Sequence, residues 1–413
     1  MKIASVLVLG ILHAVPAAAA TLTLKEAFEA ARLNMETLKR GDAVIEQSVE
    51  QKNRARALML PNLSGVGTYT RIDAPDAAGN SPFLLTRQYV AALRLTQPLF
   101  RGGSLTGYQL AKENILLAKF QKDASELSLY QLVITSYYNL SMAQMDVKNL
   151  EELLAYSKER VGEIRERTSI GRSRKGELVE AQAQLLAAES QYQQGLIDLQ
   201  EAERTFEFYT KTKPGEIGPL QSIPKLSGSL EEYYRRLRVR PDIQANAQLS
   251  RAAERQISIA KGGHYPSVDL TSNYYFDRTG ILATSEWDVG VAVVIPIFQG
   301  GAIAAATREA VAGKRVADLN GSEQLRSAER DLAINFQNFK QLQEQAKTLR
   351  EAVEKAREAY QLNKRDYKNG LVTNLDVLQS LNVFIQTRRS YNTVFAMTHM
   401  TEKNLEALTG VLP

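Results

Sequence analysis

The sequence predicts a mainly α-helical chain with a membrane β-barrel portion, and three observations lead to this fold class. The stretch QPLFRGG at residues 97–103 returns as IPIFQGG at residues 295–301, about 200 residues later, which indicates a tandem structural repeat. Apolar and polar residues alternate before each copy, as they do in strands. Long segments rich in Ala, Gln, Glu, Lys and Leu follow each glycine pair, a composition typical of long helices.

Residues 1–20 have the pattern of a secretory signal peptide. Lys2 precedes the apolar run 3–15, and four alanines at 17–20 form a cleavage site. A short membrane anchor is the alternative, but the run is shorter than the roughly 20 residues that a spanning helix needs. No later stretch is apolar for that long. We therefore expect an exported protein that would enter a membrane only as strands.

Composition excludes several classes of function. The formal charge is +5, or +4 without Lys2, and no basic block stands out, so nucleic acid is not an expected partner. The chain has no cysteine, which rules out disulfides, thiolate metal sites and a lipid-modified N-terminal cysteine. Of its 3 histidines, His13 lies in the signal peptide and His264 and His399 are isolated. With no nucleotide-binding glycine loop and no histidine-based triad, we expect neither an enzyme nor a cofactor.

The first repeat is expected over residues 21–212. Thr23 and Glu26 have the spacing of a capping box at the start of its first helix, which Gly41 interrupts mildly. The expected elements, in order, are a helix to about residue 58, strands 63–72 and 88–97, a long helix 104–169, and a helix from about 177 to 210.

Residues 213–229 form the inter-repeat linker because proline and glycine are concentrated there. The second repeat covers residues 230–413. Its expected elements are a helix from about 230 to 261, strands 267–276 and 287–295, a long helix 302–368, and a helix 375–408.

Prolines and glycines mark the strand–helix junctions of both repeats. A proline has no N–H and ends strand pairing, whereas glycines let the chain turn sharply before a helix begins. The junction residues are Pro61, Pro98, Gly102, Gly103, Pro266, Pro296, Gly300 and Gly301.

The strands have the pattern of transmembrane β-strands. In the last one, Trp287, Val289 and Val291 oppose Asp288 and Gly290, which gives one face apolar enough for lipid. A soluble sheet is the alternative for any single aromatic-rich hairpin. Four strands cannot close a barrel, and unpaired edges are not tolerated in lipid, so several chains must contribute strands. Two chains would leave a packed interior and three a lumen, and the polar strand faces favour three.

The last long helix carries apolar residues at steps that average about 3.5 residues, from Leu325 to Tyr360. This spacing predicts antiparallel, left-handed coiled-coil packing. A plain helical bundle core is the alternative.

The signal peptide, the doubled element order, the paired junction motifs and the turn Gly370-Leu371-Val372, followed by NLDVL at 374–378, resemble the TolC-like outer-membrane factors over nearly all of the mature chain. The resemblance implies a homotrimer with a twelve-stranded β-barrel in the outer membrane and a long helical tunnel in the periplasm. Such proteins are passive exit ducts of tripartite efflux pumps or type I secretion systems. An inner-membrane transporter and a periplasmic adaptor are their partners.

The two turns farthest from the strands would form the periplasmic tip. The resemblance implies that they dock the adaptor through Gly171, Arg172, Gly370, Leu371 and Val372. The alternative is that both are plain interhelical turns. In that case nothing explains why the apolar side chains of Leu371 and Val372 are exposed at a turn.

A carboxylate stands six residues after each of these glycines, Glu177 and Asp376, and Glu180 lies one turn beyond the first. The helix dipole alone explains acids at helix starts. Under threefold symmetry, however, they would form a ring that favours cations and raises some of its pKa values by mutual repulsion. Tyr367 matches the family's gate tyrosine. Val372 and Gln379 stand where the family often has arginine and aspartate, which leaves the ion preference open.

Two other functions compete with a duct. An exported periplasmic coiled-coil scaffold would be a soluble monomer or dimer whose strands need not alternate. An autonomous porin or binding protein would not need adaptor-type turns. The cargo and the cognate pump are not encoded in any motif of the chain.

Overall fold

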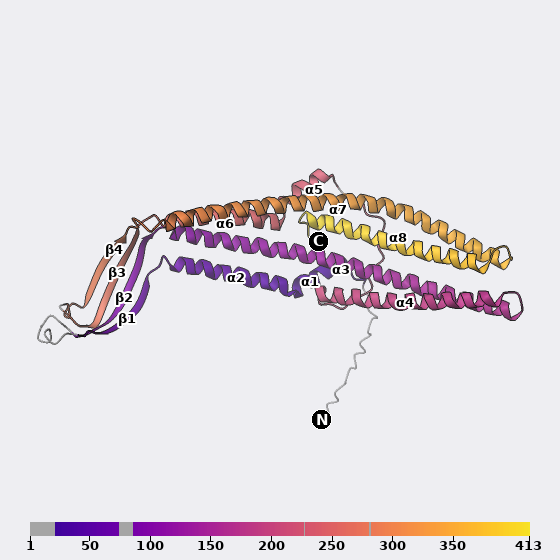
Figure 1. Ribbon diagram of the computed structural model, residues 1–413, viewed down its shortest axis with the longest axis horizontal. Coiled ribbons are helices and arrows are strands. Elements are labelled where there is room, and N and C mark those ends of the chain that lie inside the picture. Colours follow the sequence, from indigo (N-terminus) through magenta and orange to yellow (C-terminus); the bar gives the residue numbers. More distant parts are fainter. Residues whose placement is uncertain (1–20, 74–85, 227, 281) are drawn as a thin grey trace, which may run out of the picture.

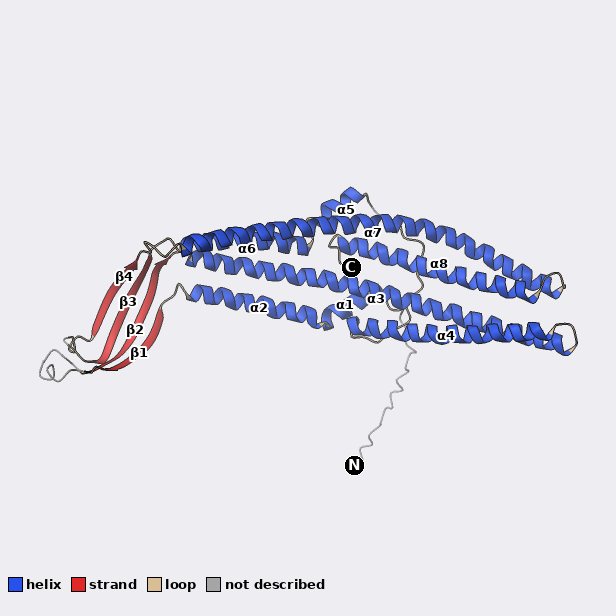
Figure 2. Cartoon of the chain, in the orientation of Figure 1, coloured by secondary structure: helices blue, strands red, loops and turns tan. Residues whose placement is uncertain are grey.

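The computed structural model describes residues 21–73, 86–226, 228–280 and 282–413. The predicted signal peptide and most of the polar loop expected between the first two strands lie outside these residues. The chain is mainly helical, with a small antiparallel sheet at one end of a long helical body (Figures 1 and 2).

The elements follow one another in the order helix, hairpin, helices, hairpin, helices. They are α1 (Leu24–Asn34), α2 (Glu36–Ala57), β1 (Asn62–Arg71), β2 (Arg87–Arg101), α3 (Ser104–Ser169), α4 (Lys175–Thr210), α5 (Leu230–Leu237), α6 (Pro241–Gly262), β3 (Ser267–Arg278), β4 (Trp287–Val294), α7 (Ala302–Lys368) and α8 (Asn374–Leu408).

The sheet has the order β1-β2-β3-β4, and each neighbouring pair is antiparallel. The two outer strands, β1 and β4, therefore each pair on one side only. The apolar side chains of β4 are exposed, with Trp287 at 66%, Val291 at 59% and Val293 at 57%. Within the described residues, no helix combines the length and the apolar character that crossing a membrane requires.

Strand β2 does not end at Pro98, as we expected, but continues to Arg101. Pairing with β1 stops at Thr96, so Pro98 lies where β2 pairs only with β3, and a register shift falls between Pro98 and Phe100. A residue without an N–H is tolerated at such a one-sided, bulged position.

Helices α3 and α7, of 66 and 67 residues, run from the sheet to the far end of the molecule without interruption (Figure 1). At 1.5 Å per residue each is about 100 Å long. Near the sheet, α2 and α6 pack beside them, and in the far half α4 and α8 do. Two shorter helices thus share the length of each long one.

The first helix is interrupted at Met35, not at Gly41. Met35 adopts an extended backbone between α1 and α2, whereas Gly41 lies inside α2. A Cβ at Gly41 would lie 2.9 Å from Cγ of Lys122 on α3. This glycine therefore lets α2 and α3 approach and does not break the helix.

The single helix expected from about 230 to 261 is two helices, α5 and α6. The chain is extended at Arg240, and Pro241 occupies the first turn of α6, where its missing N–H costs nothing. The buried Arg240 guanidinium donates two hydrogen bonds of 2.6 Å to Asp242 and one of 3.3 Å to the carbonyl of Leu408. The break thus positions an arginine that ties α6 to the end of α8.

Candidate functional site

The turn between α3 and α4 and the turn between α7 and α8 lie at the end of the molecule opposite the sheet (Figure 1). Gly171 and Gly370 take φ angles of +74° and +75°, which side chains disfavour. In both turns the glycine amide and the next amide donate to carbonyls of the preceding helix at 2.8 to 3.1 Å. These hydrogen bonds form the Schellman motif, so the two turns share one backbone structure.

The docking residues predicted from the sequence differ in exposure. Arg172 is exposed and Leu371 is 73% exposed. Val372, which we expected to be exposed, is half-buried and packs on the apolar cluster that contains Tyr367 and Val377. Its apolar character therefore has a packing reason that the sequence pattern did not reveal.

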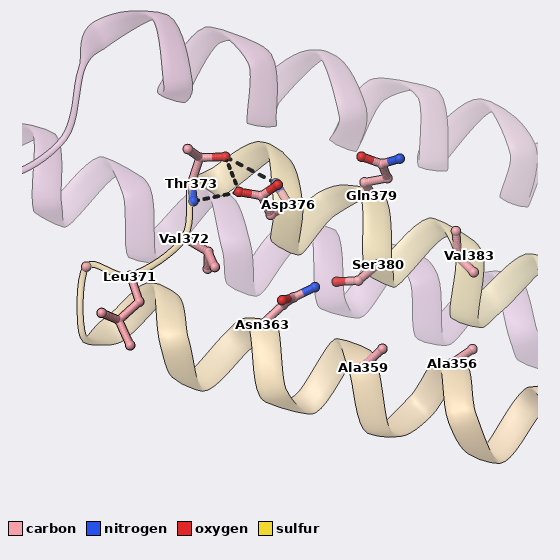
Figure 3. A pocket seen from close by; sticks show the side chains of 11 residues that line it. Ala356, Ala359, Asn363, Leu371, Val372, Thr373, Asp376, Gln379, Ser380 and Val383 are labelled. Carbon is pink, nitrogen blue, oxygen red and sulfur yellow. Dashed lines mark hydrogen bonds between the residues drawn. The ribbon is translucent and has the colours of Figure 1, made fainter.

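Asp376 begins α8 as part of a capping box. Its carboxylate accepts hydrogen bonds from the Thr373 amide at 2.8 Å and from the Thr373 hydroxyl at 2.6 Å (Figure 3). These bonds hold the pKa of the Asp376 carboxyl below its usual value. The mutual repulsion expected in a carboxylate ring would act against this effect.

Glu177 lies in the first turn of α4 and is half-buried, as is Glu180. The hydroxyl of Ser173 donates a short hydrogen bond to the Glu177 carboxylate. Glu177 and Asp376 are therefore both oriented by a hydroxyl from the turn before their helix, Ser173 for Glu177 and the N-cap Thr373 for Asp376.

Tyr367 is buried at the end of α7, where it faces two arginines of α3. The guanidinium carbon of Arg160 lies 3.8 Å from the centre of the tyrosine ring, and that of Arg167 lies 4.6 Å from it. Both distances are within the range of cation–π attraction. The predicted gate tyrosine thus connects the α7–α8 hairpin to the α3–α4 hairpin.

Arg160 strengthens the same connection through hydrogen bonds. Its Nε donates to Oδ1 of Asn374 on α8 at 2.8 Å, and its Nη1 donates to Glu163 at 2.8 Å. Arg160 is only 5% exposed, and Asn374 only 1%. We call Arg160, Tyr367 and Asn374 the tip latch, because they hold both hairpins together beside the turns.

Arg160 and Asn374 were not among the site residues predicted from the sequence. A signal was present, because Arg160 follows Leu153 and Ser157 at steps of four and three and precedes Ile164 by four, so it lies on the buried seam of its helix. An arginine on such a seam is rarely buried unless it is paired.

A groove of about 590 Å³ runs between α7 and α8 next to their turn (Figure 3). Small and polar side chains dominate its walls. The lining residues are Ala356, Ala359, Asn363, Gly370, Leu371, Val372, Thr373, Asp376, Gln379, Ser380 and Val383. Three of the predicted docking residues and one of the predicted gate carboxylates therefore border a single groove. Nowhere in the described parts of the chain do three or more His, Asp or Glu side chains gather as a metal site.

A comparison with protein families matches this chain to the model described as outer membrane efflux protein, over residues 27–210 and 233–411. Among known proteins, the chain is 23% identical over 341 residues to the probable outer membrane lipoprotein SilC of Salmonella typhimurium, covering 79% of this chain and 73% of that protein. It is 24% identical over 344 residues to the toluene efflux pump outer membrane protein TtgC of Pseudomonas putida, with coverages of 79% and 70%. It is also 23% identical over 439 residues to the proteases secretion protein PrtF of Dickeya chrysanthemi, with coverages of 100% and 93%.

The fold is similar to that of the CmeC outer membrane channel of Campylobacter jejuni, with a TM-score of 0.82 at 20% identity, covering 94% of this chain and 85% of that one. At this level of identity the likeness establishes the fold alone.

Proposed function

The chain belongs to the outer membrane efflux protein family, and on that premise we propose that it forms a homotrimeric outer-membrane channel. In this proposal it is the exit duct of a tripartite efflux pump or a type I secretion system. It conducts substrates passively from an inner-membrane transporter and a periplasmic adaptor to the exterior. The family consists of channel and transport proteins, in agreement with the lack of an enzyme motif.

The observation that carries the proposal is the pair of unpaired sheet edges, β1 and β4, on strands that expose apolar side chains. In hydrocarbon each unpaired backbone group costs several kcal/mol, so the sheet is stable there only if other copies pair with both edges. Three copies of the four-stranded sheet would form a twelve-stranded barrel. The helical body would continue this barrel as a tunnel into the periplasm.

The turns at the end of the helical body opposite the sheet support the part of the proposal that concerns the periplasmic adaptor. We propose that the adaptor docks on the exposed turns, where Gly171 and Gly370 fix the backbone and Arg172 and Leu371 project outward. Val372 contributes from its half-buried position at the border of the groove. In the resting channel the tip latch holds the α7–α8 hairpin against α3 and keeps the tunnel narrow.

In this proposal the inner-membrane transporter selects the cargo, and the channel accepts whatever that transporter delivers. The relatives include an outer membrane protein of a toluene efflux pump and a protein named for protease secretion, so their names support both small molecules and polypeptides. The rival function, a periplasmic coiled-coil scaffold, gives no reason for the exposed apolar side chains of the outer strands β1 and β4.

The assembly is tested by cell fractionation, detergent extraction and electrophoresis without heating. We expect an outer-membrane band at the mass of three chains that becomes one chain after boiling. A soluble band at the mass of a single chain would remove the channel proposal and favour the scaffold.

The carboxylate ring is tested in planar bilayers by replacing Glu177 with Gln and Asp376 with Asn together. The amide of Asn keeps an acceptor for Thr373, so the variant removes charge and leaves the capping box in place. We expect cation selectivity to fall, seen as a reversal potential closer to zero in a salt gradient. An unchanged reversal potential would refute the ring, and Glu189→Gln on the same helix is the control for a charge far from the turn.

A further inference from the structure

The four strands divide their side chains between two faces of the sheet, and paired residues of antiparallel strands share a face. The face that carries Trp287 and Val289 is apolar, and the channel proposal places it against lipid. Asp288 of β4, its partner Asn273 of β3 and that residue's partner Arg94 of β2 lie in one row on the opposite face. In a membrane barrel this polar face lines the lumen.

Hydrogen bonds run along this row. Nε of Arg94 donates to Oδ1 of Asn273 at 2.8 Å, and Nδ2 of Asn273 donates to Asp288 at 2.7 Å. The hydroxyl of Tyr275 donates to the second oxygen of Asp288 at 2.7 Å. Because the amide of Asn273 is neutral, it orients the guanidinium of Arg94 without balancing its charge.

The other charged side chains on the luminal face of the strands are paired. Arg101 lies 3.0 Å from Asp269 at the end of the strands nearest the helices. Arg278 lies 4.0 Å from Asp288 near the other end. Among the described residues, Arg94 has no carboxylate within ion-pair distance, and its side chain is exposed. Each chain therefore brings one unbalanced positive charge to the wall of the lumen.

We infer that Arg94 is a specificity-determining residue that attracts anionic solutes into the barrel. This inference rests on the proposed channel and adds to it a preference among cargoes. Twelve strands about 4.8 Å apart, tilted by about 40°, form a barrel of roughly 12 Å radius. A ring of arginines on so narrow a wall raises the concentration of anions inside it. Only the Nε–H of Arg94 is used in the described contacts, so both Nη groups can donate to an anion.

The neighbours of Arg94 on the luminal face suit an anion as well. Ser64 pairs with Arg94 on β1, and Thr96 lies two residues along β2, beside Thr271 of β3. Hydroxyls donate hydrogen bonds to anions and bring no competing negative charge. The proposed carboxylate ring at the tip has the opposite sign, so the barrel and the tip act on ion selectivity in opposite directions.

The inference is tested by the reversal potential in planar bilayers, across a potassium chloride gradient with about 0.01 M on the dilute side. There the Debye length is about 30 Å and spans the barrel. We expect Arg94→Gln to lower the ratio of chloride to potassium permeability roughly threefold or more, because one positive charge per chain is lost. Arg94→Lys keeps the charge and should keep the ratio of the unmodified protein. At about 1 M salt, where the Debye length is about 3 Å, the three proteins should no longer differ.

A second variant, Ser64→Asp, changes the same charge without replacing Arg94. A carboxylate at the paired position on β1 would neutralise the guanidinium, so the permeability ratio should fall as it does in Arg94→Gln. The matched control is Arg71→Gln. Arg71 lies seven residues after Ser64 on the same strand, and therefore on the opposite face of the sheet, so its loss should leave the ratio unchanged.

Three results would contradict the inference in distinguishable ways. An unchanged ratio in both Arg94→Gln and Ser64→Asp, in proteins that still conduct and migrate as trimers without heating, would overturn it and leave the channel proposal standing. A fall in Arg94→Lys as large as in Arg94→Gln would overturn it too, because the charge would then not be the cause. Absence of both trimer and conductance in the unmodified protein would overturn the channel proposal as well.

Discussion

Replacing Arg160 with alanine is expected to open the tip of the channel. The change removes the guanidinium that lies 3.8 Å from the ring centre of Tyr367 and that donates to Asn374 at 2.8 Å. A cation–π contact and a charged hydrogen bond together are worth about 2 kcal/mol or more. If the closed state of the tip loses that amount of stabilising free energy, the ratio of closed to open channels falls roughly thirtyfold.

Single-channel conductance in planar bilayers measures this effect. Arg160→Ala should spend far more time in a high-conductance state than the unmodified protein. Arg160→Lys should be intermediate, since a lysine keeps the charge near Tyr367 but does not reproduce the planar donor to Asn374. Arg165→Ala removes an exposed arginine from the same helix and should change nothing. Equal conductance for Arg160→Ala and the unmodified channel would mean that the latch does not hold the tip closed.

Replacing Gly102 with alanine is expected to destabilise the first strand–helix junction by about 3 kcal/mol. The new Cβ would lie 2.0 Å from the carbonyl oxygen of Gly262 and 3.0 Å from its carbonyl carbon. Both atoms belong to the backbone, so no side chain can rotate away, and α6 must move off α3. The measurement is thermal unfolding in detergent by circular dichroism, together with the yield of assembled protein.

Gly107→Ala is the matched control, because Gly107 lies in the first turns of α3 and no described atom comes within 4 Å of its Cβ position. An alanine inside a helix is more favourable than a glycine by about 1 kcal/mol, so this variant should be as stable as the parent or more so. Equal stability of Gly102→Ala and Gly107→Ala would contradict the packing argument.

The sequence predicted the helical body and the small antiparallel sheet because both depend on local periodicity. Alternation in the last two strands and the apolar steps along α7 are strong signals over many residues. Pro98 was harder to interpret, because a proline is compatible with a strand wherever one side has no partner, and the partner of β2 on each side was not known before the sheet order.

The prediction of where the first helix is interrupted was wrong for a similar reason. Met35 carries no breaking signal in the sequence, and its side chain is buried in a core cluster with residues of α1 and α3. Gly41 looked like a break but serves a close contact with Lys122. A glycine in a helical pattern is compatible either with a break in the helix or with a close contact between two helices. Only the position of the neighbouring helix distinguishes these two cases.

The candidate site was predictable in part. The glycine turns and the capping carboxylate Asp376 follow from local rules, and the structure has both. The tip latch joins residues more than 200 positions apart, as the hydrogen bond between Arg160 and Asn374 illustrates. Such pairing depends on how two hairpins are placed in space, which no local pattern contains.

The continuous course of α3 and α7, beside pairs of shorter helices, has a mechanical consequence. About halfway along the molecule, α2 and α6 begin and α4 and α8 end, and other contacts bridge the two halves at this level. There α1 packs on α3 and α4, α5 packs on α7, and Arg240 joins α6 to the end of α8. A long helix bends gently more easily than it stretches or breaks. The middle of the molecule therefore resists bending of α3 and α7, because shorter elements brace both long helices there.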